Sequence, residues 1–310
     1  MLTVLQTALE VGLIYGLVAL ALFISFSILN IADLSTDGCF TLGCAVGAML
    51  TIAGHPLLAL PAAMAAGVLS GFITAFLQTR LGVESILAGI ISNTGLYTIN
   101  LAVMGFSSNV SITGVDTVFS LFKGLVGGQW SRLILLALIA AVIVIVLIRF
   151  FGTSLGLSIR ATGDSLDMVS ASSINPKATI TIGLCLANAL TALSGCLIGE
   201  YNKFCDINLG TGMVTIALAS LIIGEVFAGH RGGVGKRIVC VVLGSIVYRF
   251  IIALALRLNI SAEYFKLVSA VIVAVAIAAP NMKGYVRLAK IKSNARKLRA
   301  LSGKGDETDA

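Results

Sequence analysis

Residues 30–38 read Asn30-Ile-Ala-Asp33-Leu-Ser-Thr-Asp37-Gly38 and separate two long apolar runs. Residues 1–79 contain no lysine or arginine, and their only carboxylates are Glu10, Asp33 and Asp37. A carboxylate deep in a bilayer is costly and is found mainly where it faces a cavity, a partner or a pathway. This break is therefore the first candidate for a functional element. Asp33 and Asp37 could meet the ammonium group of a solute, or could cap Gly-rich helix ends and hold the break in shape.

The rest of the chain has the composition of a membrane protein. Of its 310 residues, 58% are hydrophobic and only 11% are charged, against roughly 25% charged in an average soluble domain, and its mean hydropathy is +1.03. Apolar runs recur that are long enough to cross a hydrocarbon core of about 30 Å. The strands of a membrane β-barrel would give much weaker runs with a period of two. We therefore expect an all-α polytopic bundle of about nine segments (eight to ten), at roughly 8–29, 38–54, 57–79, 85–105, 132–151, 179–200, 212–228, 237–257 and 264–282.

The distribution of lysine and arginine predicts the orientation. Eight of the 21 basic residues lie between Lys283 and Lys304, after the last apolar run. The positive-inside rule makes residues 283–310 a cytoplasmic tail of a transmembrane domain 1–282, in preference to a nucleic-acid-binding arm. Counting back places the loops at 152–178 and 229–237 inside and those at 106–131 and 201–211 outside. The N-terminus lies outside if all nine segments span, whereas a re-entrant second segment would change both the count and that side.

A faint repeat relates two parts of the chain. Segment 8–29, its break and segment 38–54 resemble segment 179–200, the break 201–211 and segment 212–228, and both breaks contain carboxylates. The expected topology gives these two units opposite orientations. Inverted repeats with broken helices at a midplane site are typical of transporters.

The sequence predicts no enzymatic centre. The glycine-rich stretch 232–237 fails the phosphate-loop pattern, because His230 stands where a glycine is required and Arg237 where a serine or threonine is required. The six cysteines form no C-x-x-C pair, and no group of residues has metal-ligand spacing. We expect no cofactor and no bound metal, and read the cysteines as small buried thiols.

The most specific feature is the loop 152–178. Asp164 is a good N-cap and Asp167 follows three residues later, as in an approximate capping box. Leu166, Val169 and Ser173 would share one face of a short helix over 164–174, which Asn175-Pro176 would end. This is the only compact, capped helix that the sequence predicts outside the membrane. Taken alone, such an element is more often a connector than an interaction site.

These motifs carry a resemblance to a known family. Arg160-Ala-Thr-Gly163, a short helix and Ile174-Asn175 resemble the coupling segment of the permeases that serve ABC importers for branched-chain amino acids and ribose-type sugars. The stretches 30–47 and 229–244 are similar to the first re-entrant region and the late glycine-rich loop of those permeases. The chain differs from those permeases at two places. Ser173 replaces the glycine that usually precedes Ile-Asn, and residues 31–38 differ from the sequence of the branched-chain group. A branch related to putative amino-acid importers fits better.

The resemblance implies a permease subunit in the cytoplasmic (inner) membrane of a bacterium, carrying a small amino acid or similar polar solute. It also implies three kinds of protein partner: a second permease copy or close paralogue, a pair of cytoplasmic ABC ATPase subunits that hydrolyse the ATP, and an extracytoplasmic substrate-binding protein. The alternative is a self-contained secondary transporter whose buried carboxylates bind protons or sodium. We expect the substrate pathway to involve Asn30, Asp33, Asp37, Asn93, Glu200 and Asp206. ATPase coupling would use Arg160, Gly163, Asp164, Leu166, Asp167, Met168, Val169 and Ile174.

Overall fold

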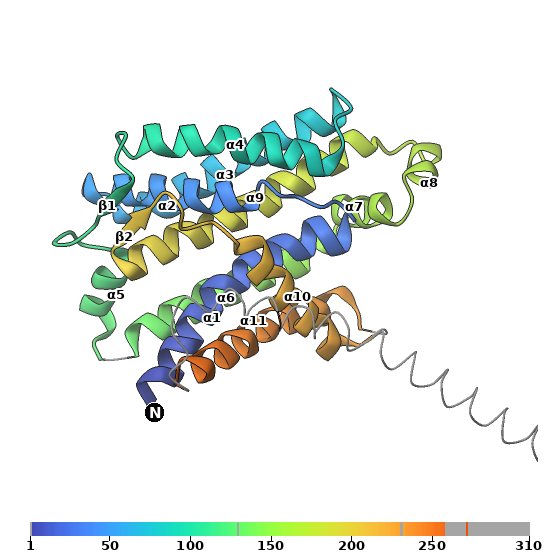
Figure 1. Ribbon diagram of the computed structural model, residues 1–310. Coiled ribbons are helices and arrows are strands. Elements are labelled where there is room, and N and C mark those ends of the chain that lie inside the picture. The colour runs from blue at the N-terminus through green and yellow to red at the C-terminus, as the bar shows by residue number, and fades with distance from the viewer. Residues whose placement is uncertain (1, 129, 230–231, 258–270, 272–310) are drawn as a thin grey trace, which may run out of the picture.

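The computed structural model describes residues 2–128, 130–229, 232–257 and 271, and the figures draw the remainder as a grey trace. The described chain is a bundle of helices with one two-stranded ladder (Figure 1). Its elements are α1 (Leu2–Leu22), the π-helical turn η1 (Phe23–Ile28), α2 (Thr36–Ile52), α3 (Pro56–Thr79), α4 (Ser85–Val103), β1 (Asn109–Ser111), α5 (Val118–Val126), α6 (Ser131–Phe151), α7 (Ser154–Asp164), α8 (Leu166–Ala171), α9 (Pro176–Asn202), β2 (Phe204–Asp206), α10 (Met213–Ala228) and α11 (Val234–Arg257).

Eight of the nine expected apolar segments correspond to these helices. Within the described residues, six helices are long and apolar enough to cross a bilayer, and α2 and α10 are shorter apolar helices of 17 and 16 residues. The polytopic all-α bundle with broken helices is thereby confirmed. The ninth segment, 264–282, and the tail 283–310 fall outside the described part of the chain, except for position 271.

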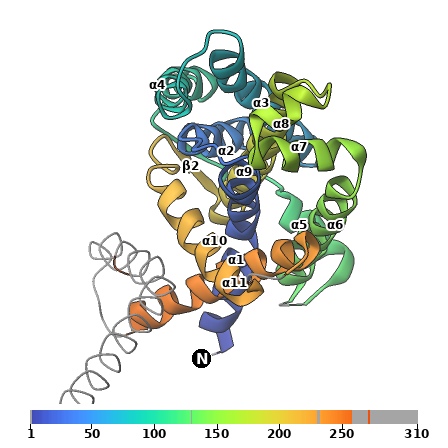
Figure 2. The ribbon, with the colours of Figure 1, turned by 90° about the vertical axis from the view of Figure 1, so that its right-hand side faces the viewer.

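Helix α9 forms the centre of the bundle (Figure 2) and packs against α1, α2 and α3. Glycines let the helices approach closely: a Cβ on Gly43 of α2 would overlap the backbone of Ala192, and one on Gly195 of α9 would overlap the carbonyl of Phe40. Small residues play this part in membrane helix packing, where van der Waals contact replaces the hydrophobic effect as the driving force. By contrast, α3, α4 and α6 expose large apolar side chains at the periphery, as helices that face lipid do.

The two ends of the bundle carry different elements (Figure 1). At one end, β1 pairs antiparallel with β2, with Val110 opposite Cys205, so the loops 106–131 and 201–211 lie on the same side, as expected. Helix α5 lies at this β-ladder end, and α7 and α8 lie at the other end. The helix near 164–174 is therefore not the only capped helix outside the long spans, because Thr117 and Ser120 form a capping box at the start of α5.

The predicted helix over 164–174 was wrong in its bounds and in its cap. The structure has two helices there, α7 and α8, and Asp164 is the last residue of α7. Ser165 is the N-cap of α8, since its extended backbone lets Oγ accept a bond from the Met168 N–H at 3.4 Å. Asn175 does not end this helix but caps α9, accepting a bond from the Lys177 N–H at 3.0 Å, with Pro176 as the first helical residue.

Candidate functional site: a joint between two interrupted helices

Two breaks in the bundle have similar paths that run in opposite directions. The first follows α1 and η1: Asn30 adopts φ 56°, the chain turns back, and α2 begins only at Thr36. The second follows α9: the chain passes through β2, Gly212 adopts φ 86°, and α10 begins at Met213. Helices α1 and α9 run in opposite directions, as do α2 and α10 (Figure 1), which agrees with the expected inverted repeat.

The two breaks meet at Asp37, in the first turn of α2. Its carboxylate accepts hydrogen bonds from the backbone N–H of Gly212 at 3.0 Å and of Val214 at 2.9 Å, at the start of α10. Thr41 accepts a further bond from the Gly210 N–H at 3.1 Å. Both half-helices thus direct their N-terminal ends, which carry partial positive charge, towards one carboxylate. We call this contact the helix joint; it consists of Asp37, Thr41, Gly210, Gly212 and Val214.

Asp33 holds the first break against the central helix. One carboxylate oxygen accepts bonds from the Ser35 N–H at 2.9 Å and the Ser35 hydroxyl at 2.6 Å. The other accepts a bond from the side-chain amide of Asn188, midway along α9, at 2.8 Å. Asp33 is only 3% exposed, so these neutral donors take the place of water around a buried carboxylate.

The structure gathers only part of the expected pathway set. Asn93 on α4 lies against the start of α2, because a Cβ on Gly38 would come within 2.6 Å of the Asn93 side-chain oxygen. Glu200 lies at the far end of α2, where it accepts bonds from the Thr51 hydroxyl at 3.1 Å and the Val118 N–H at 2.8 Å. Asp206 is the last residue of β2 and accepts a bond from the Asn208 N–H at 2.8 Å. Neither of these two carboxylates is part of the helix joint.

Sequence reasoning missed the amides that face the first break. Asn188 binds Asp33, and the Asn100 side chain donates a bond to the Gly38 carbonyl at 3.0 Å. Both are 1% exposed, and their side-chain oxygens have no hydrogen-bond partner among the described residues. The available signal was an asparagine inside an apolar helix, since a buried amide usually has a specific partner.

Helix α7 touches the place where the first break begins. Gly163 packs so closely on the end of η1 that a Cβ there would overlap the Ile28 carbonyl oxygen. This contact gives a physical reason for the glycine of the Arg160-Ala-Thr-Gly163 motif. Arg160 itself is exposed and Ile174 is half-buried.

The exposed face of α8 differs from the predicted one. Val169 is 2% exposed and packs within the chain, so it does not share a free face with Leu166 as expected. Leu166 and Met168 are 53% and 61% exposed, and Asp164 and Asp167 are exposed beside them. The apolar residues of α8 that can meet a partner are therefore Leu166 and Met168.

A charged cluster near the α7–α8 end ties three elements together. Arg237 in the first turn of α11 pairs with Glu225 of α10 at 2.6 Å and donates a bond to the Ser27 hydroxyl of η1 at 2.6 Å. Its guanidinium also lies 5.0 Å from the Phe23 ring centroid. The sequence placed Arg237 in a basic loop and gave no sign of this pairing, because the three elements are far apart in the chain.

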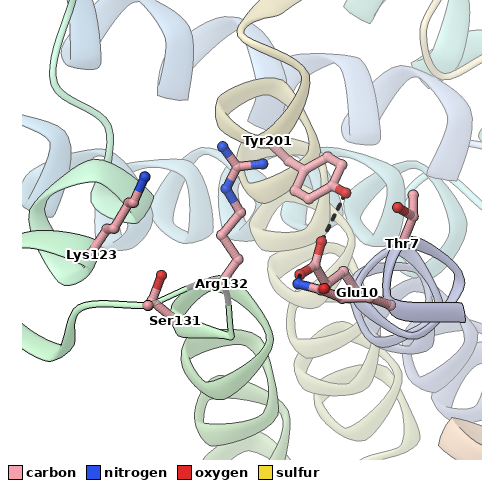
Figure 3. A pocket seen from close by; sticks show the side chains of 8 residues that line it. Thr7, Glu10, Lys123, Ser131, Arg132 and Tyr201 are labelled. Carbon is pink, nitrogen blue, oxygen red and sulfur yellow. Dashed lines mark hydrogen bonds between the residues drawn. The ribbon is translucent and has the colours of Figure 1, made fainter. Parts of the chain in front are cut away.

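Near the β-ladder end, a pocket of about 260 Å³ lies between α1, α5, α6 and the end of α9 (Figure 3). Glu10, 3% exposed, accepts bonds there from the Tyr201 hydroxyl and the Gln6 side chain, both at 2.9 Å. The Arg132 guanidinium lies 5.8 Å from the centroid of the Tyr201 ring. The third carboxylate of residues 1–79 thus holds α1 to α9.

The described residues contain neither a disulfide nor a cluster of metal ligands. All six cysteines are free, and five of them are buried. Across the searched part of the chain, no three side chains of His, Cys, Asp or Glu come together as a metal site would require. The polar groups of the joint are hydrogen-bonding and positioning groups.

The family model described as the permease component of the branched-chain amino acid transport system matches residues 4–277. The chain belongs to this permease family. It is also 32% identical, over 87% of its own length and 89% of the relative's, to a tyrosine transport system permease protein of Clostridioides difficile (strain R20291). An uncharacterized protein of Rickettsia prowazekii (strain Madrid E) is 31% identical over 88% of this chain and 96% of its own. No solved structure matches the chain.

Family membership and the apolar helices together define the molecule. The chain is a multi-pass membrane permease of the ABC transporter superfamily. It is a transport component and not itself a catalytic enzyme.

Proposed function

We propose that this permease is the membrane subunit of an ATP-driven importer that carries an amino acid or a similar small polar solute. The observation that carries the proposal is a path from α8 to the helix joint that consists of the chain itself and of one close contact between α7 and η1. Leu166 and Met168 are exposed on α8, Gly163 at the end of α7 presses on Ile28, and the break that starts there leads to Asp37. A movement imposed on α8 would therefore reach the point where both interrupted helices meet.

The α7–α8 end is the cytoplasmic one in this proposal, and the β-ladder end is extracytoplasmic. Lysine and arginine near α7, α9 and α11 support this orientation through the positive-inside rule. A separate pair of ATPase subunits would bind α8, as an amphipathic helix binds a groove. A binding protein would deliver the solute at the opposite end, and a second copy or close paralogue would complete the pathway in a bacterial cytoplasmic membrane.

The solute class is supported by the family and by one relative. The family description names branched-chain amino acids, and the name of the Clostridioides difficile relative includes tyrosine. An amino acid carries one ammonium and one carboxylate. The joint contains one group that could meet the ammonium, the carboxylate of Asp37, at the point where both interrupted helices begin.

The test is the double substitution Leu166→Asp with Met168→Asp. Both side chains are exposed in the isolated chain, so the variant should insert and fold like the wild type. Burying two such side chains in a partner is worth roughly 1.5–3 kcal/mol each before ordering costs. The variant should therefore fail to co-purify with its ATPase subunits and should lose solute-stimulated ATP hydrolysis.

The matched control places the same charges at the other end. Phe106 and Leu121, 76% and 40% exposed, lie near the β-ladder end. Phe106→Asp with Leu121→Asp should leave ATPase binding intact. Retention of the ATPase and of stimulated hydrolysis by the α8 variant would refute the assignment of α8. Uptake that survives loss of ATP but stops when the ion gradient is collapsed would favour a secondary transporter.

A further inference from the structure

Arg249 is a positive charge in the interior of a membrane-spanning helix. It lies on α11, within the apolar span Val234–Ala255 and six residues before the end of that span. Long side chains on a helix lean towards its N-terminus, which brings the guanidinium towards the middle of the span. A charged side chain at such a depth is expensive and marks a functional site by default.

The guanidinium of Arg249 contacts an aromatic ring. It lies 3.8 Å from the ring centroid of Tyr15, which is near the middle of the span Val4–Ile28. Its Nε is buried and has no hydrogen-bond partner among the described residues. Contact with an aromatic face stabilises a cation, but it leaves the Nε–H, one of the donors that match a carboxylate, without an acceptor among the described residues. Arg237 differs, because it is paired with Glu225.

Two aromatic rings connect Arg249 to the helix joint. The ring of Tyr15 stacks on that of Phe40, with centroids 6.1 Å apart and an interplanar angle of 28°. Phe40 is three residues after Asp37 on α2, and Asp37 binds the start of α10. Two stacked rings therefore separate the Arg249 guanidinium from the place where both interrupted helices begin.

We propose that Arg249 binds the carboxylate of the transported solute, with the ring of Tyr15 holding the guanidinium in place. A guanidinium presents two parallel N–H donors, so it can bind a carboxylate through both oxygens. The inference rests on the proposed function and narrows it to solutes that carry a carboxylate, such as free amino acids.

The test measures binding by the purified permease–ATPase complex in lipid nanodiscs, without binding protein or nucleotide. The probes are a mixture of the common L-amino acids and, separately, their decarboxylated amines, and retention is quantified by mass spectrometry. The wild type should retain at least one amino acid and little of its amine. Arg249→Gln should lower amino-acid retention about tenfold or more, as expected for loss of one charged, hydrogen-bonded pair, and should leave amine retention unchanged. Arg249→Lys should give intermediate amino-acid retention, because lysine keeps the charge but lacks the two parallel N–H donors of the guanidinium.

The matched control is Arg132→Gln, which removes the other arginine that lies over a tyrosine ring, near the β-ladder end. It should retain amino acids like the wild type. The inference is overturned if the wild type retains no amino acid, if Arg249→Gln and Arg249→Lys both bind like the wild type, or if Arg249→Gln lowers amine and amino-acid retention equally. The proposed function fails separately, when the wild-type complex shows no ATP-dependent uptake of any probe.

Discussion

The helix joint and helix α8 differ in where their side chains find partners. At the joint, the carboxylate of Asp37 is satisfied inside the chain by the N–H groups of Gly212 and Val214. On α8, Leu166 and Met168 are more than half exposed, and only Val169 packs within the chain. Folding of this chain therefore completes the joint, whereas α8 leaves an apolar surface for another molecule. Substitutions in the helix joint should lower the stability of the permease, whereas substitutions on α8 should weaken partner binding.

The largest effect on stability is expected from Asp37→Ala. The substitution removes two hydrogen bonds to a charged acceptor and leaves two N–H groups at the start of α10 without a partner. Hydrogen bonds to charged groups contribute roughly 1.5–3 kcal/mol each, so we expect a loss on the order of 3 kcal/mol in the free energy of unfolding. Denaturant titration of the purified permease in detergent would measure this loss.

Asp206→Ala is the matched control, because that carboxylate accepts one bond from the neighbouring Asn208 in a loop. It should cost less than about 1 kcal/mol. Equal losses for the two variants would contradict the special position of Asp37, and so would full stability and full transport in Asp37→Ala.

A smaller effect of opposite sign is expected at the α8 end from Ser173→Gly. Ser173 adopts φ 60° between α8 and α9, a conformation that favours glycine. The gain from relieving the backbone is partly offset by the greater freedom of glycine in the unfolded chain, so we expect a net stabilisation of about 0.5 kcal/mol.

Ser172→Gly provides the comparison for that change, since Ser172 has an ordinary φ of −89°. It should destabilise the permease by about 0.5–1 kcal/mol. The two variants would be compared by thermal unfolding in the same detergent. A change of the unfolding temperature in the same direction for both variants would show that glycine does not relieve strain at Ser173.

Much of the fold could be predicted from the sequence, because hydrocarbon imposes long apolar runs on any helix that crosses it. Eight expected segments and the two breaks are found in the described chain. The elements at the ends were predicted less well. The cap of α8 was misplaced by one residue because Asp164 and Ser165 are both good caps, and only the extended backbone at Ser165 decides between them.

Only part of the candidate site could be predicted from the sequence. Asp33 and Asp37 could be found because a carboxylate is conspicuous among apolar residues. The partners of Asp37 could not, since they are backbone N–H groups that leave no mark on residue identity. The exposed face of α8 was misjudged at Val169 because periodicity shows that a helix has an apolar face, but not whether its own chain covers that face.

In the proposed function, α7 transmits movement from α8 to the helix joint through the contact of Gly163 with Ile28. The most direct measurement is the ratio of solute imported to ATP hydrolysed by the complete transporter carrying Gly163→Ala, in proteoliposomes. The control is Gly95→Ala on α4, where a Cβ would meet no atom within 4 Å. We expect the Gly163→Ala transporter still to bind and hydrolyse ATP but to import several-fold less solute per ATP, while Gly95→Ala behaves like the wild type. An unchanged ratio in Gly163→Ala would show that this contact does not transmit the movement.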